Sequence, residues 1–197
     1  IDQVISHLSS GMTARSIENI SEVKSYLNEY NLITLKPVIY VCNVDENSII
    51  DGNKFSASFK DHIKSNIILI SADIESQIAT LSNEEQSDFL STLGLNESGL
   101  NKIIREGYDT LNLITYFTSG EMESRAWTIE KNTLAPDAAG KIHTDFKSGF
   151  IRAETISSED FITCKGETKA RELGKLRSEG KEYVVQDGDV MHFLFNN

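Results

Sequence analysis

The chain has few of the residues that mark extracellular, metal-binding or membrane proteins. Of its 197 residues, two are cysteine and two are proline. Cys42 and Cys164 lie far apart, outside any C-x-x-C or His-rich spacing, so they predict neither a disulfide framework nor a zinc site. No apolar run approaches the roughly 20 residues that a membrane-spanning helix needs. We therefore expect a cytoplasmic protein without a membrane segment.

Signals of secretion and of phosphate binding are also missing. The first residues, IDQVISHLSS, lack the basic start and apolar block of a secretory signal. Because the chain begins with Ile1, we expect it to be part of a longer protein. Neither Gly11-Met12-Thr13 nor Gly94-Leu95-Asn96 fits the phosphate-binding loop G-x-x-x-x-G-K-[ST]. The sequence therefore assigns no catalytic residue to this chain.

The net charge of −11 is unevenly distributed. Residues 1–114 contain 8 Lys and Arg against 16 Asp and Glu, whereas residues 115–197 contain 11 against 14. An acidic surface repels the phosphate backbone of nucleic acids. Bulk charge thus argues against non-specific nucleic-acid binding, DNA included, but leaves room for a local basic face in the second part.

The first half predicts alternating helices and strands. Apolar residues at helical spacing indicate a helix from Ser16 to Tyr30. Apolar runs at Val38–Cys42, which ends at Asn43, and at Ile67–Ile70 are typical of strands in a parallel sheet covered on both faces. Further helices are expected within Asp51–Ile63, from the capping box Ser82-x-x-Glu85 to Gly94, and along the stripe Leu100, Ile103, Ile104, Tyr108 and Leu111.

This order of elements is typical of a doubly wound α/β sheet. Two strands alone cannot bury both faces of such a sheet. The remaining strands must come from a missing N-terminal half or from a partner, and the uncovered apolar surface predicts self-association of the chain on its own.

The second half predicts short strands around one helix. Strands are expected at Ile114–Phe117, Ala126–Ile129, Phe150–Ile156, Tyr183–Gln186 and Val190–Phe195. The turn signal Asp187-Gly188 predicts that the last two form a hairpin. A single helix is expected at about Thr168–Arg177, and Gly140–Phe146 is expected to be a long polar loop. Together these elements favour an α+β, ubiquitin-like β-grasp module.

A base-binding loop is predicted where the first strand ends, at Asn43-Val44-Asp45-Glu46. In P-loop GTPases the corresponding loop reads N-K-x-D, and its Asp accepts two hydrogen bonds from guanine. Glu46 stands at the position of that Asp. Its longer side chain places the carboxylate elsewhere, so the two hydrogen bonds from guanine are expected to be lost. Backbone groups at Asn43 and Val44 could instead match the N6 donor and N1 acceptor of adenine. Ser71-Ala72, after the second strand, resembles a base-packing S-A-[KR] loop, and this resemblance implies that it packs on the same base.

The segments YFTSGEMESRAWTIEKNTLAPDAAGKIHTDFKSGFIRAE and GKEYVVQDGDVMHFLF resemble the C-terminal TGS domain of the YchF (Obg-like) ATPases. PVIYVCNVDE and ISADIES extend the resemblance upstream, although Asp73 replaces the usual basic residue. The resemblance implies the end of a helical insertion at 1–34, the C-terminal part of a P-loop NTPase domain at 35–113 and a β-grasp TGS domain at 114–197. It also implies that the full protein binds ATP with Mg²⁺ in preference to GTP and associates with ribosomes.

Basic side chains of the last part are the candidate contacts to RNA or the ribosome that this resemblance implies. They are Lys141, His143, Lys147, Arg152, Lys175 and Arg177. Arg125, Trp127 and Phe150 could add stacking surface. His143-x-Asp145 has no third ligand at a recognisable spacing, so we predict no metal site there.

Two other interpretations remain open. The chain could be a stand-alone β-grasp adaptor that binds RNA or protein without nucleotide, as TGS domains also occur in threonyl-tRNA synthetases and ppGpp synthetases. Those proteins lack the PVIYVCNVDE and ISADIES segments. The chain could also be part of a GTPase, which base competition on the full-length protein would decide.

Overall fold

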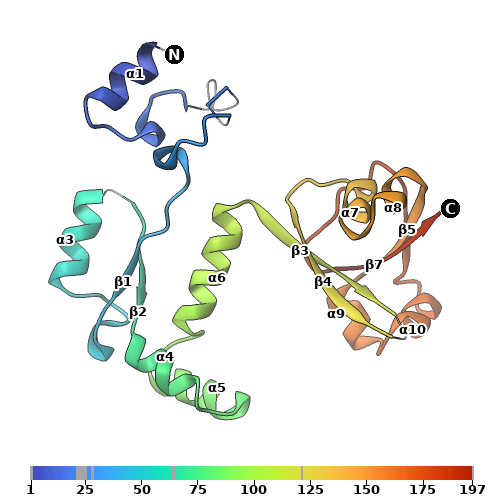
Figure 1. Ribbon diagram of the computed structural model, residues 1–197. Coiled ribbons are helices and arrows are strands. Elements are labelled where there is room, and N and C mark those ends of the chain that lie inside the picture. The colour runs from blue at the N-terminus through green and yellow to red at the C-terminus, as the bar shows by residue number, and fades with distance from the viewer. Residues whose placement is uncertain (1, 21–25, 28, 64, 121, 197) are drawn as a thin grey trace. The chain divides into compact units, whose positions relative to one another are not determined.

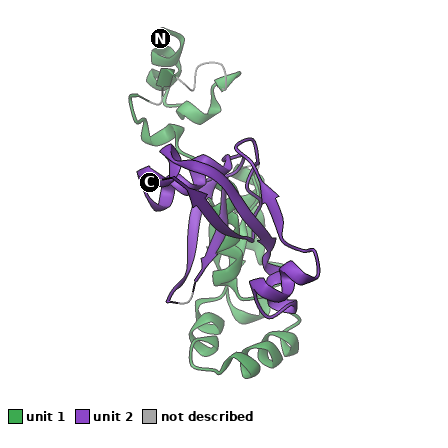
Figure 2. Ribbon diagram, turned by 90° about the vertical axis from the view of Figure 1, so that its right-hand side faces the viewer, with its two compact units in different colours: residues 1–110 green, residues 111–197 purple. Residues whose placement is uncertain are grey.

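A computed structural model describes residues 2–20, 26–27, 29–63, 65–120 and 122–196. The chain divides into two compact units, residues 1–110 (unit 1) and residues 111–197 (unit 2) (Figure 2). The predicted three-way division at 1–34, 35–113 and 114–197 stays a prediction.

The N-terminal part of unit 1 consists of short helical segments around a small apolar cluster. Its elements are α1 (Asp2–Ser9) and the 3₁₀ helices η1 (Ala14–Ser16) and η2 (Ile33–Leu35). The cluster contains Val4, Ala14, Ile17 and Leu27. The predicted helix from Ser16 to Tyr30 is wrong at its start, because Ile17 is extended and Asn19 has a φ of +55°. Residues 21–25 and 28 of that prediction lie outside the described residues.

The rest of unit 1 contains two short parallel strands with helices beside them (Figure 1). β1 (Val41–Asn43) pairs with β2 (Ile68–Ile70) in the register Val41↔Ile68 and Asn43↔Ile70, which confirms the predicted parallel pair. β1 begins three residues later than the predicted start at Val38. The other elements are η3 (Glu46–Ser48), α3 (Lys54–Ile63), α4 (Ala72–Ile78), α5 (Asn83–Thr92) and α6 (Gly99–Thr110).

Local sequence signals explain where several of these helices begin and end. The Glu85 carboxylate accepts hydrogen bonds from the N–H and the hydroxyl of Ser82, and these bonds hold the pKa of Glu85 below its usual range. Gly94, with a φ of +71°, follows the end of α5. α6 forms where the apolar stripe predicts it, yet Leu100 is 57% and Ile104 50% exposed. Half of the stripe is thus uncovered in this chain.

Unit 2 contains a five-stranded sheet in the order β4-β3-β7-β5-β6. β3 and β7 are parallel, and every other neighbouring pair is antiparallel. The strands are β3 (Leu113–Ser119), β4 (Ser124–Glu130), β5 (Phe150–Ser157), β6 (Arg177–Glu179) and β7 (Asp189–Phe195). The helices are α7 (Ala135–Ile142), α8 (Thr144–Ser148), α9 (Ser158–Thr163) and α10 (Glu167–Glu172).

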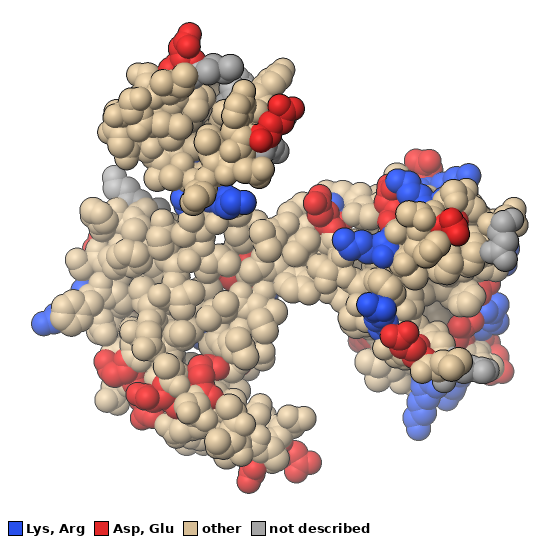
Figure 3. Space-filling view, in the orientation of Figure 1, with Lys and Arg blue, Asp and Glu red and all other residues tan. Residues whose placement is uncertain are grey.

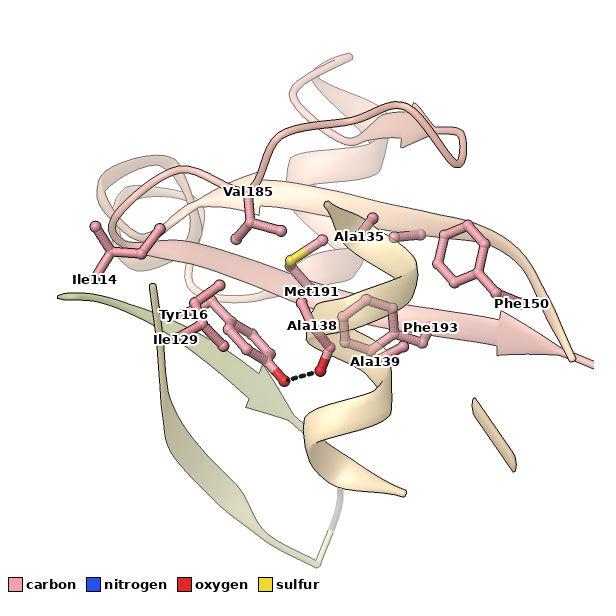
Figure 4. Packing of buried hydrophobic residues seen from close by; sticks show 11 residues of the cluster. Ile114, Tyr116, Ile129, Ala135, Ala138, Ala139, Phe150, Val185, Met191 and Phe193 are labelled. Atoms are coloured by element: carbon pink, nitrogen blue, oxygen red, sulfur yellow. Dashed lines mark hydrogen bonds between the residues drawn. The ribbon is translucent and has the colours of Figure 1, made fainter. Parts of the chain in front are cut away.

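The main core of unit 2 lies between α7 and one face of the sheet (Figure 4). Ala135, Ala138 and Ala139 of α7 are fully buried, which lets the helix approach the strands closely. The Tyr116 hydroxyl donates to the Ala138 carbonyl at 2.8 Å, and burial raises the pKa of Tyr116. Ile156 belongs to a second cluster, with Cys164 and Ala170 beside α9 and α10. Because side chains alternate along β5, this cluster lies on the opposite face of the sheet.

Three predictions for unit 2 are wrong. Tyr183–Gln186 is not a strand of a hairpin: Val184 makes an isolated bridge to Leu134, and β7 lies between β3 and β5. The helix predicted at about Thr168–Arg177 is not single: it is α10, one of four helices in the described part of unit 2, and it ends at Glu172, because Gly174 adopts a φ of +68° and the chain continues into β6. Gly140–Phe146 is not a long loop but the junction of α7 and α8.

A buried carboxylate, Asp189, organises the start of β7. It is 3% exposed and accepts hydrogen bonds from the Gln186 N–H at 2.9 Å, the Tyr183 hydroxyl at 2.8 Å and the Arg177 guanidinium at 3.2 Å. These three donors supply the partners that a buried carboxylate requires. Asp189 therefore connects β6, the loop before β7 and β7 itself.

Alkaline pH is expected to destabilise unit 2. Burial, together with the hydrogen bond to Asp189, raises the pKa of Tyr183 to about 12. The unfolded chain releases this proton near pH 10, so the free energy of unfolding falls as the pH rises from about 10 to about 12. Guanidinium unfolding followed by the fluorescence of Trp127 would measure this decline. Tyr183→Phe should make it shallower, and an unchanged slope would contradict the assignment.

Candidate functional site

The carboxyl ends of β1 and β2 bring together the five residues that the sequence predicts to contact a base. We call Asn43, Val44, Glu46, Ser71 and Ala72 the base corner. The Val44 N–H donates to the Ile70 carbonyl at 2.8 Å, and the Asn43 side-chain carbonyl accepts from the Ala72 N–H at 2.9 Å. These bonds join the two loops at the edge where open α/β sheets bind ligands.

The five residues differ in what they can offer a ligand. The side chains of Val44 and Ser71 are buried; Val44 belongs to the core of unit 1, and the Ser71 hydroxyl lies 3.5 Å from the Ile74 N–H at the start of α4. Asn43, Glu46 and Ala72 are exposed. The Val44 N–H already donates its hydrogen bond to the Ile70 carbonyl. The N–H that would donate to adenine N1 must therefore belong to another residue.

Glu46 points its carboxylate toward α4. Its Oε1 accepts a hydrogen bond from the Gln77 side chain at 2.9 Å. The neighbouring Asp45 carboxylate accepts from the Ser48 hydroxyl at 2.9 Å, within the 3₁₀ turn that follows β1. Both acidic side chains therefore have partners within the protein.

Glu75, which the sequence did not single out, connects the base corner to α6. Its carboxylate accepts from the Gly99 N–H at 2.6 Å and from the Leu100 N–H at 3.3 Å, the first turn of α6. A Cβ at Gly99 would lie 2.7 Å from the Ile70 Cγ2 atom, so only glycine lets α6 start this close to β2. α4 thus begins at the base corner, and Glu75, one turn into α4, holds the first residue of α6.

Acidic side chains dominate one surface of unit 1. Figure 3 shows them gathered where η3, α4 and α5 lie, whereas on unit 2 basic and acidic side chains alternate. A surface rich in carboxylates repels a phosphate backbone. The base corner therefore lies beside a surface poorly suited to nucleic acid.

The predicted RNA-contacting side chains of unit 2 are mostly engaged with carboxylates. Lys147 pairs with Asp137, Arg152 with Glu154 at 3.6 Å, Lys175 with Asp160 at 3.3 Å and Arg177 with Asp189 at 3.2 Å. Arg171 also pairs with Glu154, and this bond lowers the pKa of Glu154. These pairs reduce the positive potential that a phosphate would meet.

Lys141 and His143 lie at the junction of α7 and α8. Lys141 is exposed, and His143 begins α8, where its Nδ1 accepts a hydrogen bond from the Asp145 N–H at 3.2 Å. His143-x-Asp145 is therefore a helix-capping pair. Among residues 2–20, 26–27, 29–63, 65–120 and 122–196, no group of three or more His, Cys, Asp and Glu could hold a metal ion.

One predicted stacking residue is wrong. Phe150 is 4% exposed in the main core of unit 2, so its ring is not available to a base. Trp127 is partly buried, donates from its indole N–H to Thr118 at 3.0 Å and carries the Arg125 guanidinium 4.3 Å from its ring centre. No helix in the described part of the chain has the length and apolar character to cross a membrane.

Comparison with known proteins gives consistent matches. Residues 113–196 match the family model YchF-GTPase_C, described as "Protein of unknown function (DUF933)". The chain is 47% identical to the ribosome-binding ATPase YchF of Escherichia coli O157:H7 over 199 residues, covering all of this chain and 54% of that protein. It is 48% identical to the protein of the same name from Bacillus subtilis, covering 93% of this chain and 51% of that protein.

A solved structure agrees with these relatives. The Schizosaccharomyces pombe YchF GTPase superimposes with a TM-score of 0.81 and 37% identity, over 98% of this chain and 53% of that protein. The chain thus spans about half the length of the relatives it matches. Sequence and fold agree over both units: residues 113–196 match the YchF family model, and the chain as a whole is similar to the C-terminal part of YchF proteins.

Proposed function

We propose that this chain is the C-terminal part of a ribosome-associated ATPase, supplying the adenine-contacting side of the nucleotide site and a ribosome-contacting domain. The observation that carries the proposal is the base corner, in which Asn43 binds the Ala72 N–H at the carboxyl ends of two parallel strands. The names of its relatives, ribosome-binding ATPases, support the activity. Such a protein would work in the cytoplasm, where ribosomes are.

The phosphate-binding loop would come from an N-terminal half of the protein. Mg²⁺, held there with the triphosphate, would neutralise the charge that develops on the phosphates. The exposed apolar side chains of Val41, Leu100 and Ile104 support this division, because further strands and helices would cover them. We assign no catalytic role to any residue of this chain, and we expect residues 1–197 alone to be inactive.

ATP is proposed as the preferred nucleotide. The relatives are named both ATPase and GTPase, so their names do not decide the base. In this chain Glu46 occupies the position of the guanine-binding Asp of GTPases, and Gln77 holds its carboxylate toward α4. A carboxylate in that place does not form the two-bond fork to guanine, whereas backbone groups at the corner suit adenine.

In the complete protein, Glu46→Asp is expected to raise the affinity for GTP relative to ATP by about 10-fold or more. The shorter side chain brings the carboxylate within reach of the guanine N1 and N2 donors, and hydrogen bonds to a charged group contribute about 1.5–3 kcal/mol. Competition of ATP and GTP against a fluorescent nucleotide would measure the ratio. Gln77→Ala is the comparison variant: it releases Glu46 but keeps its length, so any change in the preference should be smaller than in Glu46→Asp. An unaltered ratio in Glu46→Asp would disprove the role of this position.

Unit 2 is proposed to be a β-grasp TGS domain that contacts the ribosome. Its sheet order, β4-β3-β7-β5-β6, places the first and last strands side by side and parallel, with a helix packed on one face, as in ubiquitin-like folds. The basic set Lys141, His143, Lys147, Arg152, Lys175 and Arg177 stays the predicted RNA contact, although four of these side chains are paired.

Sedimentation of the complete protein with purified ribosomes, with and without ATP, tests the function as a whole. We expect the protein to pellet with ribosomes and its ATP hydrolysis to be retained in their presence. A stand-alone adaptor would pellet without hydrolysing nucleotide. A protein that neither pellets nor hydrolyses ATP would refute the proposed function.

A further inference from the structure

A groove crosses one face of unit 2, opposite the face that α7 covers. Its floor is the row Ala126, Phe117 and Val190, which pair with one another across β4, β3 and β7. Phe161 and Ile162 of α9 form its wall. The groove encloses about 420 Å³, enough for a few side chains, and it lies entirely within unit 2.

One exposed apolar side chain lines this groove, and another lies on the turn next to it. Ile162 is 74% exposed on α9, and Met122, on the turn that joins β3 to β4, is fully exposed. Both ends of that turn, Ser119 and Ser124, line the groove. Exposed apolar surface beside a groove is typical of a binding site, and methionine is common at surfaces that accept varied apolar partners.

The charges around the groove favour a basic partner. Glu159 is exposed one helical turn before Ile162, and Glu123 is exposed next to Ser124. Arg125 also lines the groove, but its guanidinium stacks on Trp127. Across residues 111–197, 11 Lys and Arg stand against 14 Asp and Glu. Unit 2 as a whole is therefore slightly acidic, which disfavours RNA phosphates as the partner.

We propose that this groove binds a basic segment of a protein, whose apolar side chains occupy the groove and whose Lys or Arg side chains lie beside Glu159 and Glu123. The assignment of the partner as a ribosomal protein rests on the proposed function, since only the relatives' association with ribosomes points to that particle. The groove thus contacts protein on the ribosome surface, and the exposed apolar side chains supply most of the affinity.

Two exposed substitutions test this inference in the complete protein. Ile162→Lys places a cation against the basic partner, and Glu159→Lys reverses the charge beside it. Each is expected to weaken binding to purified ribosomes about 10-fold or more, the range for residues that dominate an interface. Leu173→Lys and Glu172→Lys are matched controls, since Leu173 is 59% exposed and neither residue lines the groove. The controls should bind within about twofold of the wild type.

A second probe, ribosomal proteins freed of RNA, separates the possible outcomes. Wild-type protein should bind this preparation, and Ile162→Lys should not, while thermal unfolding followed by Trp127 fluorescence shows that the variant is folded. Tighter binding of Glu159→Lys to ribosomes, with equal binding to naked ribosomal RNA, would mean that RNA occupies the groove and would overturn the inference. If all four variants bind ribosomes as tightly as the wild type does, the inference is overturned, but the proposed function stands. If the wild type binds neither ribosomes nor the ribosomal proteins freed of RNA, both the inference and the proposed function are overturned.

Discussion

Residues 1–197 alone are expected to bind ATP at least about 100-fold more weakly than the complete protein, and to hydrolyse none. Nucleotide-binding sites obtain most of their affinity from charged and backbone contacts to phosphates, which a P-loop supplies. The base corner offers a ligand the exposed residues Asn43, Glu46 and Ala72 and nearby backbone groups, and acidic side chains gather beside it. Isothermal titration calorimetry with Mg-ATP on both proteins measures the difference.

Adenosine provides the control for this experiment. If the corner contacts only the base, residues 1–197 should bind adenosine and ATP with similar, weak affinity. In the complete protein, ATP should bind far more tightly than adenosine. Micromolar affinity of the isolated chain for ATP would show that this half holds phosphates after all.

The second large effect concerns Asp189. Asp189→Ala is expected to lower the free energy of unfolding of unit 2 by about 3–5 kcal/mol, because it removes three hydrogen bonds to a buried carboxylate. The substitution removes the acceptor for Arg177, Tyr183 and the Gln186 N–H together. Guanidinium unfolding followed by Trp127 fluorescence reports on unit 2, because Trp127 is the one tryptophan of the sequence and packs against that core.

Asp187→Ala is the matched control for Asp189→Ala. Asp187 lies in the same turn, but it is exposed and accepts a hydrogen bond from the Thr115 N–H at 2.8 Å. Its loss should cost about 1 kcal/mol. Equal effects of the two substitutions would mean that the turn itself, and not the buried carboxylate, stabilises this end of the sheet.

The sequence predicted that the residues of the base corner lie close together, because its signals there are local. The apolar runs before Asn43 and Ser71 indicate strands, and parallel strands place their carboxyl ends at one edge of a sheet. What it could not show is which corner residues are buried. Val44 is buried because Ile74 and Ile78 of α4 pack in the same cluster, and Ser71 is buried as the residue that caps α4. α4 is a helix of seven residues, too short to show a periodic apolar stripe in the sequence.

In unit 2 the errors come from long-range pairing. Asp187-Gly188 does form a turn, with Gly188 at a φ of +82°, but the strand after it joins β3 and β5 instead of the segment before it. Asp189 is buried because β7 lies between β3 and β5. The turn signal alone predicts a surface residue at this position. Helices such as α8, with five residues, are too short to show helical periodicity.

The contact of Glu75 with the first turn of α6 has a mechanical consequence. Ser71 and Ala72 begin α4, Glu75 holds the Gly99 N–H, and α6 extends from there for 12 residues, about 18 Å, to the segment that enters β3. A base that displaced the Ser71–Ala72 peptide would shift α4 and, through Glu75, α6. Occupancy of the base corner would then be communicated through the Glu75 carboxylate to α6, the last helix of unit 1.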